Sequence, residues 1–165
     1  MITIIAAHDN NRVIGYQGSI PWHIKADMKH FKENTTGHIV VMGRKTYQSL
    51  GKALKNRINI VVSKTPSFSP KDALVFPSLE EALAYGMNWE GKLVTFIIGG
   101  EQIYKEGMKY ADNMLITHVM GTSLGDAYFP EIDMNSFYEL ARSDILDEDG
   151  FKYQYISYNK KRPKN

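Results

Sequence analysis

One acidic residue within an apolar helical pattern is the first candidate for chemistry in this chain. Residues 24–34 predict a helix in which Ile24, Met28 and Phe31 share one face, because their spacing follows the helical period. Asp27 lies at the edge of that face. A carboxylate turned toward a core is costly unless something pairs with it. Asp27 therefore indicates either a site for a cationic or amidine-like ligand or an ordinary solvated residue at the margin of the stripe.

A long segment without a sustained period precedes this helix. It runs from His8 to Trp22 and contains several turn-forming residues. Structureless connections of this length are uncommon in compact domains and often act as lids or binding loops. Its position directly before the helix favours the ligand-binding interpretation of Asp27.

The segment Gly43-Arg44-Lys45-Thr46 is a candidate phosphate site. It follows an apolar strand, and a helix start with free N–H groups and two cations suits a phosphate. It is not a Walker A motif, which needs G-x-x-x-x-G-K-[ST], because a strand separates Gly37 from Gly43. A plain strand-to-helix turn is the alternative interpretation of these residues.

Two other features have both a structural and a functional interpretation. The pair Gly99-Gly100 follows the apolar strand 93–98 and permits close approach of the backbone to a ligand, or simply a tight turn. Arg57 precedes the strand 58–63. Its planar guanidinium can bind a carboxylate with two hydrogen bonds, or it can be an exposed cation at a strand start.

Metal and covalent chemistry are not indicated. No serine lies in a nucleophile elbow, and the absence of cysteine excludes disulfides and thiolate chemistry. No metal-ligand spacing such as H-E-x-x-H is found among the histidines, which are His8, His23, His30, His38 and His118.

Composition predicts one ordinary globular domain spanning residues 1–165. Hydrophobic residues make up 43% of the chain and charged residues 23%, which is typical of soluble proteins. The net charge of 20 − 18 = +2 is too small to indicate a nucleic-acid partner. The chain begins with a strand-like segment rather than a leader, and no apolar run approaches the roughly 20 residues that span a bilayer. We therefore expect a soluble, cytoplasmic protein without a membrane partner.

Alternation of strand and helix patterns predicts an α/β fold. Strands are expected at 2–7, 38–42, 58–63, 73–76, 93–98, 113–119, 137–143 and 151–158. Helices are expected at 24–34, 44–50, 78–85 and 100–110, with Ser78 and Glu81 forming a capping box. The acidic turn 147–150 predicts that the last two strands form an antiparallel hairpin. The expected architecture is a three-layer sandwich with a mostly parallel eight-stranded sheet and helices on both faces.

The order and spacing of these motifs resemble dihydrofolate reductase. The resemblance runs in register from Met1 to about Pro130 and continues weakly through the aromatic C-terminal segment. Each motif is only moderately specific, but together they make a strong match. The matching residues are Arg12-Val13-Ile14-Gly15, Pro21-Trp22, Asp27, Phe31, Met42-Gly43-Arg44, Thr46, Arg57, Gly99-Gly100, Tyr104, Thr117-His118 and Gly125-Asp126.

The resemblance implies the activity and its catalytic residues. The implied reaction is NADPH-dependent reduction of 7,8-dihydrofolate to tetrahydrofolate, with hydride transfer to pterin C6 and protonation at N5. Asp27 would bind the N3 and 2-amino edge of the pterin and favour protonation at N5, with the proton arriving on a water molecule. Thr117 would hydrogen-bond Asp27 directly or through water. Ile20 and its loop would close over the nicotinamide, and Trp22 would brace the end of that loop.

The resemblance also implies two sets of binding residues. Besides Asp27 and Thr117, the substrate set is Ile5, Ala6, Ala7, Met28, Phe31, Lys32, Leu50, Leu54, Arg57, Ile98 and Tyr104, with Arg57 assigned to the α-carboxylate of the glutamate tail. The NADPH set is Ala7, Ile14, Gly15, Ser19, Ile20, Gly43, Arg44, Lys45, Thr46, Val62, Ser63, Lys64, Ile98, Gly99, Gly100, Glu101, Gln102, Ile103, Tyr104 and Asp126. The family also has a cis peptide bond in the glycine pair. The expected partners are dihydrofolate and antifolate small molecules, and the expected state is a monomer.

The sequence departs from the family at three points. Residues 52–56 lack the proline-rich turn that the family usually has, which leaves the rigidity of this loop open. Ile20 replaces the commoner methionine or leucine, and Gln102 stands where many relatives have a cation.

The sequence leaves two alternative functions. A related pyrimidine reductase of riboflavin synthesis is disfavoured by the combination of Pro21-Trp22 with Asp27 and Phe31. A non-enzymatic nucleotide-binding module is disfavoured because Asp27 and Arg57 would serve a substrate rather than a nucleotide.

Overall fold

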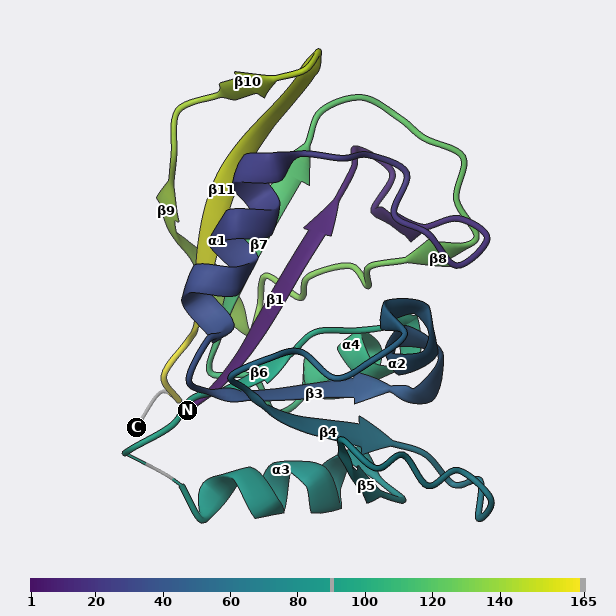
Figure 1. Cartoon of the computed structure of the whole chain (residues 1–165). Helices are drawn as coiled ribbons and strands as arrows, with labels where there is room; N and C mark the ends of the chain where they lie inside the picture. The colour runs from purple at the N-terminus through teal and green to yellow at the C-terminus, as the bar shows by residue number, and fades with distance from the viewer. Residues whose placement is uncertain (90, 164–165) are drawn as a thin grey trace.

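The chain folds around one mixed β-sheet with helices on both faces (Figure 1). The computed structural model describes residues 1–89 and 91–163. The helices are α1 (Lys25–Thr35), α2 (Arg44–Leu50), α3 (Leu79–Met87) and α4 (Glu101–Gly107). The strands are β1 (Ile2–His8), β2 (Val13–Gly15), β3 (Ile39–Gly43), β4 (Ile58–Val62), β5 (Leu74–Phe76), β6 (Thr95–Ile97), β7 (Asn113–Val119), β8 (Ala127–Tyr128), β9 (Phe137–Arg142), β10 (Leu146–Glu148) and β11 (Phe151–Lys160).

The main sheet has the order β10-β11-β7-β1-β6-β3-β4-β5, and β9 also pairs with β11. Strands β9 and β10 follow one another along the edge of β11 that does not face β7, so the sheet is eight strands wide. The six strands from β7 to β5 are parallel, and β11 is antiparallel to β7. All eight expected strands belong to this sheet, with small shifts at their ends. The predicted three-layer α/β architecture is therefore confirmed.

The C-terminal hairpin differs in detail from the prediction. The strand that turns into β11 is the short β10, through Asp149 and Gly150 with φ of 51° and 82°. Positive φ at both central residues is the geometry of a type I′ turn, for which Asp-Gly is well suited. Strand β9 ends at Arg142 and pairs further along β11. The hairpin is antiparallel as expected, but its first strand is not the one predicted.

The segment before α1 also contains structure that the sequence pattern did not reveal. Strand β2 pairs with β8 in a separate two-stranded sheet, with Val13 opposite Tyr128. A three-residue strand is too short to show an alternating pattern, and its partner lies far along the chain. The expectation of an entirely irregular loop from His8 to Trp22 is therefore wrong.

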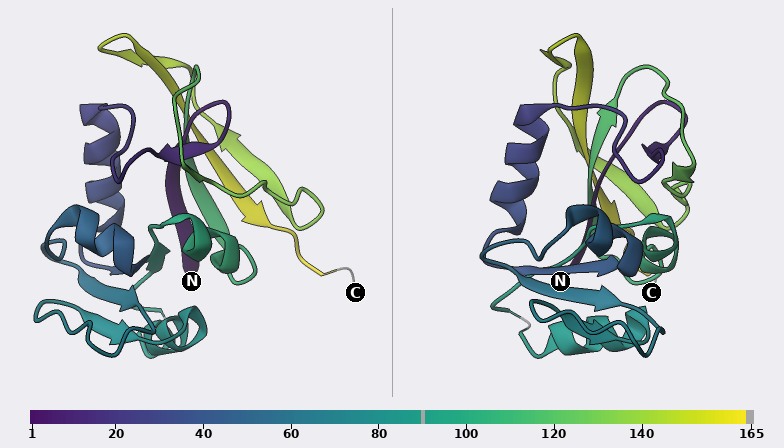
Figure 2. Two further views of the ribbon diagram at one scale, coloured as in Figure 1. Left: turned by 90° about the vertical axis from the view of Figure 1, so that its right-hand side faces the viewer. Right: turned by 45° about the vertical axis from the view of Figure 1, so that its right-hand side comes forward.

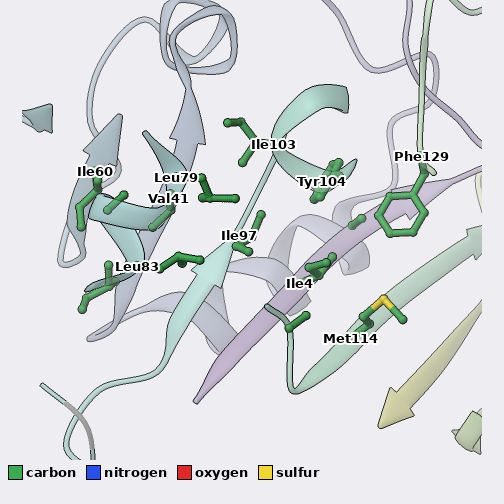
Figure 3. Close-up of a cluster of buried hydrophobic side chains, with 14 of the residues drawn as sticks. Ile4, Val41, Ile60, Leu79, Leu83, Ile97, Ile103, Tyr104, Met114 and Phe129 are labelled. Carbon is green, nitrogen blue, oxygen red and sulfur yellow. The ribbon is translucent and has the colours of Figure 1, made fainter. Parts of the chain in front are cut away.

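Alternating side chains divide the core between the two faces of the sheet. One face packs against α3 and α4, and Figure 3 shows this cluster, including Ile4 and Ile97 of the sheet and Ile103 of α4. The other face contains Ile5, Val40, Met42, Val61 and Phe96 and packs against Phe31 of α1 and Tyr47 of α2. Asp27 and Thr117, described below, lie on this second face, whereas the cavity lined by Leu79 and Ile103 lies on the first.

Local capping defines the start of α3 as predicted. The Ser78 hydroxyl accepts a hydrogen bond from the Glu81 backbone N–H at 3.1 Å. The helices in the described parts of the chain are all too short or too polar to cross a membrane.

Candidate active site

Asp27 lies in the first turn of α1, and a distant carboxylate caps that helix. The residue at the N-cap, Ile24, provides no side-chain cap. Instead, Glu148 of β10 accepts hydrogen bonds from the backbone N–H groups of Lys25, at 2.5 Å, and Ala26, at 3.3 Å. A negative charge at a helix N-terminus is stabilising. The C-terminal hairpin thus fixes the end of α1 that carries Asp27.

Thr117 of β7 contacts Asp27 directly. Its hydroxyl donates to Asp27 Oδ1 at 2.7 Å, so the predicted hydrogen bond is confirmed. Burial raises the pKa of Asp27 above its ordinary value, while the hydrogen bond from Thr117 and the nearby His30 partly oppose that rise. No donor in the described residues reaches Oδ2 of Asp27. The site therefore offers a desolvated carboxyl with one oxygen available to a ligand.

Four of the predicted apolar residues pack together on the α1 face of the sheet. Ile5, Phe31, Leu54 and Ile98 belong to one hydrophobic cluster. Three large apolar side chains remain exposed, one from the segment before α1, one from α1 and one from α2: Ile20 at 63%, Met28 at 58% and Leu50 at 41%. Exposed apolar side chains on neighbouring elements are typical of a ligand cleft.

Met28 corrects the initial interpretation of the α1 stripe. The helical period suggested that Ile24, Met28 and Phe31 all pack into the core. Thr35 is the only buried residue within α1, and Met28 is exposed. Ile24 is buried and Phe31 packs against the α1 face of the sheet, so Met28 alone of these three side chains is exposed and available to a ligand.

Ala6 and Tyr104 have their side chains on the opposite face of the sheet. Successive strand residues point to opposite faces, so Ala6 joins the cluster under α3 and α4, whereas Ala7 packs with Trp22 on the α1 face. Any contact of Ala6 with the substrate would therefore be made by its backbone. Tyr104 is also buried in that cluster, and its hydroxyl donates to the Ile5 carbonyl at 2.8 Å. Its contribution to the cleft is to hold the backbone of β1.

The two glycine turns meet at the carboxyl ends of β3 and β6. The Gly43 N–H donates to the Gly99 carbonyl at 2.8 Å, and the Gly99–Gly100 peptide bond is cis, as the family resemblance implied. Gly99 has a φ of 118°, and a Cβ there would lie 3.1 Å from the Tyr104 ring. A side chain at this position would therefore meet both strain and crowding.

A cavity of about 230 Å³ lies beside these turns. Its walls include the predicted cofactor residues Val62, Ser63, Lys64 and Ile103. Arg44 lies at the start of α2, and its Nη1 donates to the Thr65 hydroxyl at 3.2 Å. Lys45 and Gln102 are exposed. The sequence interpretation missed the remaining wall, which consists of Pro77, Ser78, Leu79 and Glu106.

Residues 14–20, here called the lid, are attached to the loop between β7 and β8. The Asp126 N–H donates to the Gly15 carbonyl at 3.0 Å, and the Gln17 N–H donates to Asp126 Oδ2 at 2.9 Å. At its other side the lid contacts α2, where the Ser49 hydroxyl donates to the Gly18 carbonyl at 3.2 Å. Figure 2 shows the lid in purple against the green segment that contains β8. The lid thus spans from β8 to α2.

Trp22 lies between the lid and α1, and its side chain is buried. It is 7% exposed and packs with Ile24, Val119 and Tyr153. This is the environment of a packing residue rather than of a group that contacts a ligand.

Arg57 is oriented by two contacts at the far end of α1. Its Nε donates to the Lys55 carbonyl at 2.9 Å, and its Nη1 donates to the Thr35 hydroxyl at 3.1 Å. A guanidinium has five N–H donors, so N–H groups remain for a carboxylate ligand. Lys32, also predicted to bind substrate, is exposed near the same end of α1.

Hydrogen bonds hold the loop that lacks proline. The Ala53 N–H donates to Asp72 Oδ2 at 2.8 Å, and the Leu54 N–H donates to Asn59 Oδ1 at 2.9 Å. Proline could not make either bond because it has no N–H. Asp72 and Asn59 therefore anchor this loop, and neither was identified from the sequence.

These features define a class of α/β enzyme that binds its ligands at the carboxyl ends of the sheet strands. A family model for dihydrofolate reductase matches residues 1–160. The chain is 37% identical to a dihydrofolate reductase type 3 of Salmonella typhimurium, covering 98% of this chain and 99% of the relative. It is 38% identical to the dihydrofolate reductase of Bacillus subtilis, covering 98% and 95%. It is similar to the structure of dihydrofolate reductase from Enterococcus faecalis complexed with NADP(H) and RAB-propyl, with a TM-score of 0.91, 36% identity and coverage of 98% and 97%.

The chain belongs to the dihydrofolate reductase family. It is an oxidoreductase that catalyses the NADPH-dependent reduction of dihydrofolate.

Proposed function

We propose that Asp27 and Thr117 form the catalytic centre of this reaction, and that 7,8-dihydrofolate binds between α1 and the sheet. The observation on which this proposal rests is the largely buried carboxyl of Asp27, which accepts a hydrogen bond from Thr117 and keeps its second oxygen free of donors among the described residues. A dihydropterin presents two adjacent N–H donors, at N3 and the 2-amino group. Asp27 accepts both, which replaces the water that the carboxyl loses on burial.

Asp27 also promotes the proton transfer. Its negative charge, in a partly desolvated site, stabilises positive charge on the bound pterin and so favours protonation at N5. The carboxyl binds the edge of the ring remote from N5, and the proton therefore reaches N5 through a water molecule. Thr117 keeps the carboxyl in the orientation that this binding requires.

The remaining substrate residues bind the rest of the molecule. Ile5, Phe31, Leu54 and Ile98 form the apolar walls for the pterin and benzoyl rings, and Met28 and Leu50 lose their exposure when the ligand binds. Arg57 binds the α-carboxylate of the glutamate tail through its remaining N–H groups, and Lys32 lies at the same end of the cleft.

Replacing Arg57 with lysine tests the tail assignment. Arg57→Lys keeps the charge but loses the planar fork, so binding of dihydrofolate should weaken by about 1.5–3 kcal/mol, or roughly 10- to 150-fold. Binding of a small diaminopyrimidine without a tail should barely change. Both affinities are measured by fluorescence titration, with Arg142→Lys in β9 as the matched control. Equal losses for the two ligands would show that Arg57 supports the site in general and does not recognise the carboxylate.

The residues that follow strands β3, β4 and β6 suit a phosphorylated nicotinamide cofactor. Gly43, Gly99 and Gly100 leave the backbone open to a close ligand, and a Cβ at Gly100 would lie 3.4 Å from Thr46 Oγ1. Arg44, Ser63 and Lys64 lie at the carboxyl ends of β3 and β4, beside the cavity, where they are suited to the 2′-phosphate. When bound, NADPH supplies the hydride that is transferred to C6. Ala7, Ile14, Ile20 and Ile98 hold the nicotinamide end and exclude water from it.

Removing the Thr117 hydroxyl tests its role beside Asp27. The hydrogen bond from Thr117 lowers the pKa of Asp27, so Thr117→Val should move the apparent pKa of the rate profile upward, while loss of the bond that orients the carboxyl should lower the rate on the low-pH plateau. The rate is measured across the pH range for the variant and for Thr3→Val, which removes another strand hydroxyl that donates to a side chain, Asn113. An unchanged profile in Thr117→Val would remove Thr117 from the proposed centre.

We further propose that residues 1–165 form a single domain that acts as a monomer in the cytoplasm and that antifolate compounds bind in the same cleft. The continuous sheet, to which strands from both ends of the chain contribute, supports the single domain.

A further inference from the structure

Asp9 is a buried carboxylate that lies outside the substrate cleft. It is 1% exposed and directly follows β1. Its Oδ1 accepts hydrogen bonds from the backbone N–H groups of Asn11 and Val13, both at 2.9 Å. Its Oδ2 accepts from the N–H of Ser123 at 2.7 Å. One side chain thus joins two loops that are more than a hundred residues apart in sequence.

The two loops that Asp9 joins lead directly to the lid contacts. Val13 begins β2, and its side chain packs so closely on Gly125 that a Cβ there would lie 2.5 Å from it. Immediately after Gly125, Asp126 pairs with Gly15 and Gln17 of the lid. The hydrogen bond from the Ser123 N–H to Asp9 therefore helps to set the distance between the β7–β8 loop, which carries Asp126, and the lid.

The chemistry of Asp9 is that of a bridge between loops. No cation among the described residues forms an ion pair with it, so backbone N–H groups replace the water that this charge has lost. The local turn with Asn11 and Val13 uses only Oδ1 of Asp9, whereas the hydrogen bond from the Ser123 N–H uses Oδ2. An asparagine would keep Oδ1 for Asn11 and Val13 and would present an NH₂ group to the Ser123 N–H, which cannot accept. Asp9→Asn therefore removes this side-chain link between the loops and keeps the local turn, while the hydrogen bond from the Asn10 N–H to the Gly121 carbonyl remains.

We propose that Asp9 is a positioning residue for cofactor binding: it holds the β7–β8 loop against the base of the lid, so that Asp126 fixes the lid over the nicotinamide. This inference rests on the proposed role of the lid. Asp9 itself contacts neither substrate nor cofactor.

The test compares Asp9→Asn with wild type for two ligands. The dissociation constant for NADPH should rise by about 10-fold, the scale of one lost hydrogen bond to a charged group. Binding of a tail-free diaminopyrimidine should stay within about 2-fold, since the Asp27 cleft is unchanged. Asp133→Asn is the matched control, because Asp133 makes the same kind of turn contacts with Asn135 and Ser136 before β9. It should bind both ligands as wild type does.

A double-mutant cycle with Asp126→Asn separates positioning from general stabilisation. If Asp9 acts through Asp126, the double variant should bind NADPH little more weakly than the weaker single variant. Additive losses, parallel loss of both ligands, or wild-type NADPH binding by Asp9→Asn would each overturn the inference. If Asp9→Asn does not fold, Ser123→Pro removes the same N–H from the other side and the same outcomes apply. A wild-type chain that fails to bind NADPH would instead contradict the proposed function.

Discussion

Asp27→Asn is expected to lower turnover at neutral pH by at least about 100-fold, the scale of positioned acid–base assistance. Asparagine keeps the shape of the side chain and can still accept a hydrogen bond from Thr117. It removes the negative charge that favours protonation at N5, and it replaces one acceptor for the pterin edge with a donor. The measurement is kcat for the purified variant, with circular dichroism to verify the fold.

The pH dependence of the wild-type enzyme gives a second signature of Asp27. Burial raises the pKa of this carboxyl, and protonation of the complex is required for reduction. Activity should therefore fall as pH rises past an apparent pKa that lies above the ordinary value of an aspartate. That value belongs to the coupled carboxyl and pterin rather than to Asp27 alone. A flat profile from about pH 5 to about pH 9 would contradict the role of Asp27.

The raised pKa of Asp27 also predicts an effect on the free energy of unfolding. A carboxyl whose pKa is higher in the folded state contributes stability below its unfolded pKa and loses that contribution as pH rises through the folded pKa. Asp27→Asn should therefore unfold at a higher temperature than wild type at neutral pH, and this advantage should shrink below about pH 4. Asp112→Asn is the control, because Asp112 also accepts one hydrogen bond, from the Ile2 N–H, at the start of β1.

Near-wild-type turnover in Asp27→Asn would remove Asp27 from the mechanism.

Arg44→Ala is expected to weaken NADPH binding by about 1.5–3 kcal/mol, the range for charged hydrogen bonds. That corresponds to roughly 10- to 150-fold in affinity, with little effect on NADH, which lacks the 2′-phosphate. Discrimination should be softer than in relatives with a cation at the position of Gln102. The measurement is kcat/KM for both cofactors at low and high salt, since screening weakens exposed charge contacts.

A control distinguishes recognition of the 2′-phosphate from a general effect of positive charge on cofactor binding. Lys105→Ala removes one exposed cation of α4 and should leave the preference between the two cofactors unchanged. Equal losses with both cofactors in Arg44→Ala, or a wild-type preference for NADH, would show that the phosphate assignment is wrong.

Local patterns in the sequence predicted the sheet, the helices and the position of Asp27. Alternation and helical spacing depend on neighbours within a few residues, so a single sequence reveals them. The contact between Thr117 and Asp27 needed more than a pattern, because it joins residues 90 apart. It followed from the resemblance to a family.

The supporting residues could not be predicted in this way. Asp9 and Glu148 bond to N–H groups 114 and 123 residues away along the chain. Nothing in the local sequence distinguishes them from exposed acids in turns. Asp72 is a similar case, since its bond to Ala53 matters only because the loop lacks the proline of its relatives. These three acids hold the loop around Ser123, the start of α1 and the loop of residues 52–56, respectively.

Reduction of dihydrofolate by the purified chain is the most direct test of the account. The consumption of NADPH is followed by its near-ultraviolet absorbance, with dihydrofolate or with the pyrimidine intermediate of riboflavin synthesis. We predict NADPH consumption only with dihydrofolate, and its near abolition in Asp27→Asn but not in Asp112→Asn. No consumption with dihydrofolate, or consumption only with the pyrimidine, would contradict the account.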